Sequence, residues 1–71
     1  MSAVGIQFVG GPADGRLLAI PGDPFNPPHT YELRDVHGHR LIHRRHVNPG
    51  DDGPLWHYHY EGTARREERA P

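Results

Sequence analysis

Hydrophobic and polar positions alternate with a period of two residues along much of the chain. Val4, Ile6 and Phe8 share one face of an extended segment near the start, and Tyr58 and Tyr60 do the same near the end. This period is typical of a β-strand that buries one of its faces. The pattern predicts five short strands, at residues 4–9, 16–20, 30–36, 40–47 and 55–60.

The connections between these segments are rich in turn residues. Residues 10–15 (Gly-Gly-Pro-Ala-Asp-Gly) predict a tight turn in which the Asp14 side chain caps the backbone and glycine supplies positive φ angles. The first two strands are therefore expected to form a β-hairpin. The structural residues of its turn are Gly10, Gly11, Pro12, Asp14 and Gly15. Residues 21–28 contain four prolines and little periodicity, which predicts a loop whose Phe25 packs onto the core or onto a partner.

The expected architecture is all-β, a small five-stranded antiparallel barrel or sandwich. A helix over residues 40–47 would accommodate Leu41 and Ile42, but no N-cap residue precedes them, so a strand is favoured. Residues 1–62 are predicted to form a single domain. Residues 63–71 are expected to form a short charged tail, either solvated or turned into one helical turn. A chain of 71 residues without cysteine has a thin stability margin, which a metal or a partner chain would raise.

Composition narrows the possible functions. Eight basic residues stand against nine acidic ones, which argues against strong general binding to nucleic acid. All eight basic residues are arginine, as a GC-rich genome favours. No apolar run is long enough to span a bilayer, and no membrane contact is expected. The start of the chain lacks a signal-peptide pattern, so the protein is expected to stay in the cytoplasm where it is made.

Seven histidines are the most conspicuous chemical feature. Residues two apart on a strand point to the same side, so His57 and His59 are candidate ligands for one metal ion such as zinc. His37 and His39 are the second candidate pair. No carboxylate completes a known metal motif, and serine occurs only at position 2, so no catalytic residue is predicted. The alternative, which we favour, places His57 and His59 on the solvent face of an edge strand, with no cofactor.

Two further patterns bear on partners. The aromatic stripe of residues 56–60 suits either base stacking or the core, and the core is favoured because the chain has only six aromatic residues. The fourth segment is the most cationic and suits contact with an acidic protein surface or another copy of the chain. The candidate partner-contact residues are Phe25, Arg40, Arg44, Arg45, His43 and His46.

One family resemblance adds to this picture. The segment 8–15 with its Gly-Gly-Pro-x-Asp-Gly turn, the proline-rich middle, Tyr31 at a strand start and the closing Tyr58-x-Tyr60-Glu61-Gly62 resemble small proteins of tailed bacteriophages and prophages. The hosts of these phages are GC-rich actinobacteria. The resemblance implies a phage origin, with synthesis in the bacterial cytoplasm, and it carries over no catalytic residue.

Three functional hypotheses follow. The leading one is a non-enzymatic structural accessory protein of the phage particle, such as a capsid-decorating or capsid-stabilising subunit, that contacts other virion subunits or its own copies. The second is a small phage effector that binds a host protein or sequesters an anionic signalling nucleotide through Arg44, Arg45 and the histidines. The third and weakest is a histidine-ligated metal protein.

Overall fold

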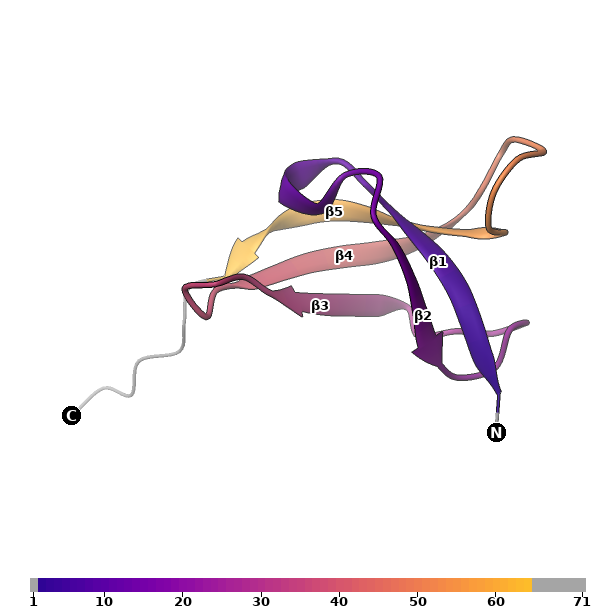
Figure 1. The fold of residues 1–71 in the computed structure, drawn as a ribbon, viewed down its shortest axis with the longest axis horizontal. Coiled ribbons are helices and arrows are strands. Elements are labelled where there is room, and N and C mark those ends of the chain that lie inside the picture. Colours follow the sequence, from indigo (N-terminus) through magenta and orange to yellow (C-terminus); the bar gives the residue numbers. More distant parts are fainter. Residues whose placement is uncertain (1, 65–71) are drawn as a thin grey trace.

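A computed structural model describes residues 2–64 as five strands that form one sheet (Figure 1). The strands are β1 (Ala3–Val9), β2 (Leu17–Pro21), β3 (Thr30–Arg34), β4 (Arg40–Val47) and β5 (Trp56–Ala64). A single 3-10 turn, η1 (Gly11–Ala13), lies between β1 and β2. The all-β prediction is confirmed. Residues 63 and 64, expected in the tail, belong to β5, and the remainder of the predicted tail lies outside the described residues.

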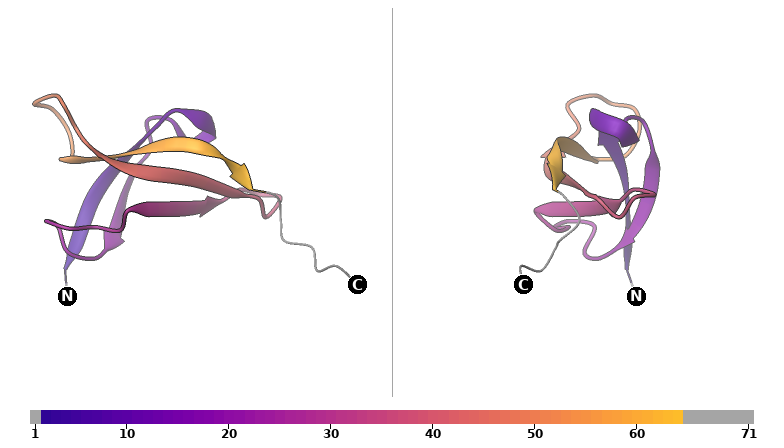
Figure 2. Two further views of the ribbon diagram at one scale, coloured as in Figure 1. Left: turned by 180° about the vertical axis from the view of Figure 1, so that it is seen from behind. Right: turned by 90° about the vertical axis from the view of Figure 1, so that its left-hand side faces the viewer.

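The sheet is mixed, which corrects the expectation of a wholly antiparallel fold. Its strand order is β2-β1-β5-β4-β3. Three neighbouring pairs are antiparallel, but β1 and β5 run parallel, with Ile6 opposite Trp56 and Phe8 opposite Tyr58. A parallel pair needs a long crossover connection, and here β2, β3 and β4 supply it. The sheet curls into a half-barrel, so it has one concave inner face and one convex outer face (Figure 2).

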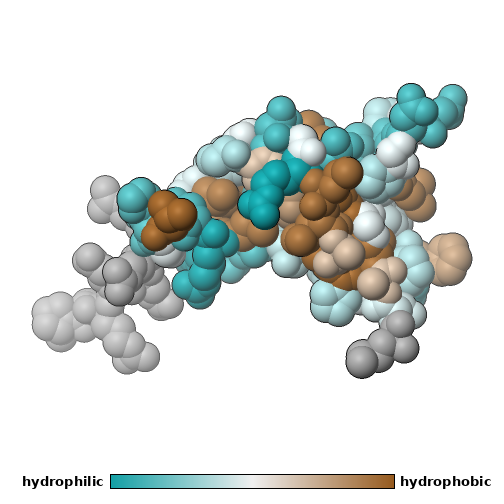
Figure 3. Space-filling view, viewed as in Figure 1, coloured by the Kyte–Doolittle hydropathy of each residue, from teal (hydrophilic) through white to brown (hydrophobic). Residues whose placement is uncertain are grey.

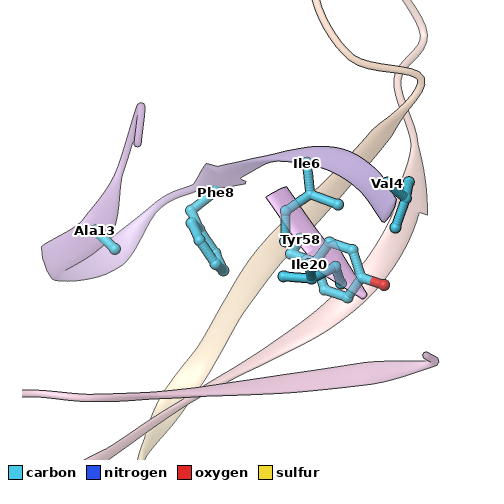
Figure 4. Close-up of a cluster of buried hydrophobic side chains, with 6 residues drawn as sticks. All are labelled: Val4, Ile6, Phe8, Ala13, Ile20 and Tyr58. Atoms are coloured by element: carbon cyan, nitrogen blue, oxygen red, sulfur yellow. The ribbon is translucent and has the colours of Figure 1, made fainter. Parts of the chain in front are cut away.

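The hydrophobic core lies inside the curl (Figure 4). Alternation on β1 sends Val4, Ile6 and Phe8 inward, and Ile20 and Tyr58 meet them from β2 and β5. The aromatic stripe is thus mainly a core element, as expected: Tyr58 is fully buried, and its flanking aromatic residues on β5 are half-buried. Large aromatic rings give this small core much of its buried area.

The turn between β1 and β2 confirms the predicted hairpin and cap. The Gly10 amide donates to Oδ1 of Asp14 at 2.7 Å, and the Gly15 amide donates to the Phe8 carbonyl at 2.7 Å. Gly10, Gly11 and Gly15 have φ angles of 80°, 70° and 85°. Gly11 also lies against the face of the Tyr60 ring, where a Cβ atom would come within 2.6 Å of Cδ2. The turn therefore needs glycine at this position for two separate reasons.

Candidate functional site

Three histidines gather on the outer face of the sheet, where β4 and β5 pair. His46 lies directly opposite His57 in the strand register, and its ring centroid is 4.3 Å from that of His59. The rings of His57 and His59 are 6.3 Å apart. Partial burial, followed by the nearby charges of His46 and His57, lowers the pKa of His59. We call His46, His57 and His59 the outer histidine cluster.

The structure separates the two predicted histidine pairs. His37 and His39 lie in the turn before β4, where both backbone amides donate to Oδ1 of Asp35. His46 lies near the other end of β4, so at about 3.3 Å per residue the two groups are roughly 20 Å apart. The four candidate ligands thus do not form one site. Within residues 2–64, no group of three or more histidine, aspartate or glutamate side chains is arranged to hold a metal ion.

The setting of His57 and His59 also differs from the favoured interpretation. They share the outer face, as their spacing predicts, but β5 is the central strand of the sheet and not an edge. His46, which was expected to contact a partner, joins them because the β4–β5 register brings it there. The spacing of the histidines along the chain contains no signal for this contact.

Two of the three arginines predicted to meet a partner form ion pairs within the fold. Arg44 Nε lies 3.0 Å from a Glu61 carboxylate oxygen, and Arg40 Nη1 lies 3.5 Å from one on Glu32. These pairs are largely exposed, so each contributes little to stability. They nevertheless reduce the net charge that β4 presents to a partner.

Arg45 has a different role. Its guanidinium donates to Asn26 Oδ1 at 3.0 Å and to the Pro27 carbonyl, and it lies 4.9 Å from the centre of the Trp56 ring. These contacts tie the loop after β2 to the sheet. With Arg44, His29 and Thr30 it also lines a pocket of about 330 Å³ on the surface.

His43 is inside the protein, which corrects its prediction as a partner contact. The side chain is fully buried, and its ring centroid lies 4.6 Å from that of Phe8. Nδ1 is 3.1 Å from the Leu41 carbonyl oxygen, whereas Nε2 is buried without a partner among the described residues. Burial lowers the pKa of His43, although its backbone hydrogen bonds act in the opposite direction. His43 is therefore a neutral core residue.

Acidification is expected to destabilise the fold. Unfolded histidine titrates near pH 6.5, whereas the pKa values of His43 and His59 are lowered in the folded state. As the pH falls below about 6.5, the unfolded state takes up protons that the folded state does not, so the free energy of unfolding decreases. The contribution of these two histidines to the free energy of unfolding is fully present above about pH 6.5. Each 1 kcal/mol lost lowers the melting temperature by roughly 4–8 °C.

Thermal melts at pH 7.5 and 5.5 measure this effect. His43→Phe should flatten the pH dependence, because phenylalanine fills a similar space without a titrating group. His29→Gln removes an exposed histidine instead and is the matched control for the loss of the buried ring. A wild-type melting temperature that is equal or higher at pH 5.5 would contradict the argument.

The loop of residues 22–29, the Phe25 loop, is fixed firmly to the sheet. The Tyr58 hydroxyl donates to the Pro28 carbonyl at 2.6 Å, and Trp56 Nε1 donates to the Pro24 carbonyl at 2.8 Å. Pro27 is fully buried. Phe25, in contrast, is 85% exposed, so it does not plug the core. The loop holds a large aromatic side chain out into solvent.

Other exposed apolar side chains lie at the same end of the molecule. Val47 ends β4, and Leu55 immediately precedes β5, with its carbonyl accepting from the Asn48 amide at 2.7 Å. Figure 1 shows the Phe25 loop and the 48–55 loop at one end of the sheet, opposite the β3–β4 turn. We call this end, with Phe25, Val47 and Leu55, the apolar end. Val36, which is 94% exposed, lies in the turn at the other end.

Comparison of the chain with known protein families, curated proteins and solved structures identifies its family. Residues 4–67 match a family described as a domain of unknown function, DUF8847. The chain belongs to this family. No curated protein and no solved structure matches the chain significantly. In the part of the chain that the structure describes, no helix is long and apolar enough to cross a membrane.

Proposed function

We propose that this DUF8847 protein is a non-enzymatic accessory subunit of a phage particle that binds a protein surface through its apolar end. The observation that carries the proposal is the display of Phe25 on an immobilised loop. A loop whose backbone is already fixed loses little conformational entropy on association. Aromatic side chains supply much of the binding energy at protein interfaces.

The composition and the surface charge support the same function. The half-buried Arg40 and the exposed Arg44 are each paired with a glutamate of the same chain, which leaves less positive charge on β4 for a partner and favours the apolar end as the contact surface. The resemblance to small proteins of tailed phages points to the virion as the location of the partner. Other virion subunits, or copies of the chain itself, are the proposed partners, and no catalytic residue or cofactor is assigned.

Replacing Phe25 tests the proposal. Phe25→Ser is expected to leave the melting temperature unchanged, since the side chain makes no core contact. It should weaken binding to purified shells that lack this subunit by about 30-fold, as a hot-spot side chain worth about 2 kcal/mol would. Val36→Ser is the matched control, because Val36 is 94% exposed, slightly more than Phe25, but lies at the opposite end.

Co-sedimentation with shells at increasing concentrations measures the affinity, and mass spectrometry of purified virions tests the location. Equal binding by the Phe25→Ser and Val36→Ser proteins would contradict a role for the apolar end. Absence of the chain from purified virions would contradict the structural role itself.

The pocket lined by His29, Thr30, Arg44 and Arg45 favours a second candidate function, an effector that binds an anionic nucleotide. Two contacts argue against this second function: Arg44 is already paired with Glu61, and Arg45 binds the Phe25 loop. Calorimetric titration with cyclic nucleotides separates the two functions, since the structural role requires no heat of binding.

A further inference from the structure

The two edges of the sheet differ in a way that concerns self-association. The edge strands are β2 and β3, and each leaves a row of backbone amides and carbonyls without a neighbouring strand in the described part of the chain. Such an edge pairs readily with another strand unless charged side chains protect it. The residues whose backbone groups point outward therefore decide how well each edge is protected.

Hydrogen bonds at both ends of the hairpin identify these residues on β2. The Phe8 amide donates to the Arg16 carbonyl at 2.9 Å, and the Gly22 amide donates to the Ser2 carbonyl at 3.1 Å. Hydrogen-bonded positions alternate along an antiparallel pair, so the even-numbered residues of β2 bond to β1. The backbone groups of Leu17 and Ala19 therefore face the open edge.

Pro21 fits the same assignment. It is the third residue of β2 in the outward-facing set, and proline is tolerated in a strand where its missing N–H would have faced away from the neighbour. Its carbonyl remains available to accept a hydrogen bond from another chain.

The β3 edge is protected, and the β2 edge is not. The Arg45 amide donates to the His29 carbonyl and the Asp35 amide to the His39 carbonyl, so Thr30, Glu32 and Arg34 face outward on β3. Two of these three are charged, and all are exposed. The outward-facing residues of β2 are all uncharged, and Leu17 is 66% exposed.

The surface beside the β2 edge is apolar as well. Leu17, Ala19, Gly5 and Pro54 contribute to a shallow pocket of about 310 Å³. Figure 3 shows hydrophobic surface gathered over β1 and β2. A strand added to β2 would cover Leu17 with its own side chains.

We propose that two copies of the chain associate through antiparallel pairing of their β2 edges, with the two-fold axis between the two Ala19 residues. In this register the Ala19 residues exchange amide–carbonyl hydrogen bonds, and each Leu17 amide donates to the Pro21 carbonyl of the second copy. Because the pairing is isologous, every contact occurs twice. The result is one continuous sheet across both chains.

The charges flanking β2 favour a second copy over an unrelated peptide. Arg16 immediately precedes the strand, and Asp23 follows it by two residues. Antiparallel pairing about Ala19 places Arg16 of one chain opposite Gly22 of the other, one residue before Asp23, at both ends of the interface. Such complementarity fixes the register of association. The pairing is made by the backbone of β2 and does not require Phe25, so the inference does not depend on the proposed function.

A single cysteine tests both the pairing and its register, since the natural chain has none. Facing residues of a hydrogen-bonded antiparallel pair have Cα atoms about 5.5 Å apart, which a disulfide can span. Ala19→Cys should therefore oxidise to a covalent dimer at low protein concentration. Thr30→Cys, at the equivalent outward position on the β3 edge, is the matched control and should stay mainly monomeric.

Sedimentation equilibrium provides an independent measurement. The wild-type chain should show a concentration-dependent mass twice that of the monomer, and Ala19→Lys should raise the dissociation constant at least about tenfold by placing a charge on the edge. Circular dichroism establishes that the variant is folded. A wild-type chain that is monomeric at millimolar concentration, an unaffected Ala19→Lys dimer, or faster cross-linking through residue 30 would overturn the proposal. A dimer that persists while Phe25→Ser loses shell binding would separate the two surfaces.

Discussion

Gly11→Ala is expected to destabilise the protein by about 3 kcal/mol or more, which is a large part of what so small a domain has available. A residue with a side chain at a φ of 70° costs about 1–3 kcal/mol. The new Cβ atom would in addition meet the Tyr60 ring, at 2.6 Å from Cδ2 and 2.7 Å from Cδ1. Overpacking of this kind typically costs a further 1–3 kcal/mol.

Gly15→Ala is the matched control for this substitution. Gly15 lies in the same turn with a φ of 85°, but nothing lies within 4 Å of the position of its Cβ. The Gly15→Ala protein should therefore lose only the conformational contribution, about 1–3 kcal/mol, without the cost of the ring contact. Urea denaturation of both variants measures the difference, and Tyr60→Ala should recover part of the loss in the Gly11→Ala background. Equal destabilisation by the two glycine substitutions would show that the ring contact has no energetic role.

Tyr58→Ala should cost about 3–5 kcal/mol, the usual range for removing a large aromatic side chain from a core. Tyr58 is fully buried in the concave face, with ring centroids 6.4 Å from Phe8 and 6.3 Å from Tyr31. Its hydroxyl is also the anchor of the Phe25 loop. One residue thus links the core of the half-barrel to the segment that displays Phe25.

Tyr58→Phe separates these two roles. It keeps the ring but leaves the Pro28 carbonyl without its donor, which should cost about 1–2 kcal/mol and accelerate amide exchange in the Phe25 loop. Tyr31→Phe is the control, since the Tyr31 hydroxyl has no hydrogen bond to another described residue, and it should leave stability nearly unchanged. Urea denaturation and hydrogen exchange measure the two effects. Tyr58→Phe that matches Tyr31→Phe in both would contradict the anchoring role.

Local patterns in the sequence were sufficient to locate the strands and turns but not to predict how the strands pair. Alternation, together with short apolar runs bounded by turn residues, located all five strands within a few residues. The turn at residues 10–15 was also accessible, since its glycines and Asp14 act on their own neighbourhood. The parallel pairing of β1 with β5 joins segments some 50 residues apart, and nothing in either segment specifies its partner.

For the candidate site, too, the sequence predicts local features but not the contacts between strands. On β4, one face carries Leu41, His43, Arg45 and Val47 and the other carries Arg40, Ile42, Arg44 and His46. Both faces mix aliphatic residues with arginine and histidine, so the period alone does not reveal which is buried. The curvature of the sheet turns the face that carries His43 toward the core, so this face is the buried one. The outer histidine cluster likewise depends on the β4–β5 register. In the Phe25 loop there is no period at all, and burial of Pro27 rather than Phe25 follows from hydrogen bonds that only the folded chain makes.

The position of β5 has a consequence for how the chain acquires its structure during synthesis. β5 follows every other described strand in the sequence, yet it is the central strand that joins the β1–β2 hairpin to the β3–β4 hairpin. A nascent chain that has emerged only as far as β4 holds two separate hairpins, and isolated hairpins are marginally stable in water. Cooperative folding therefore waits for translation of β5, whose residues begin at Trp56.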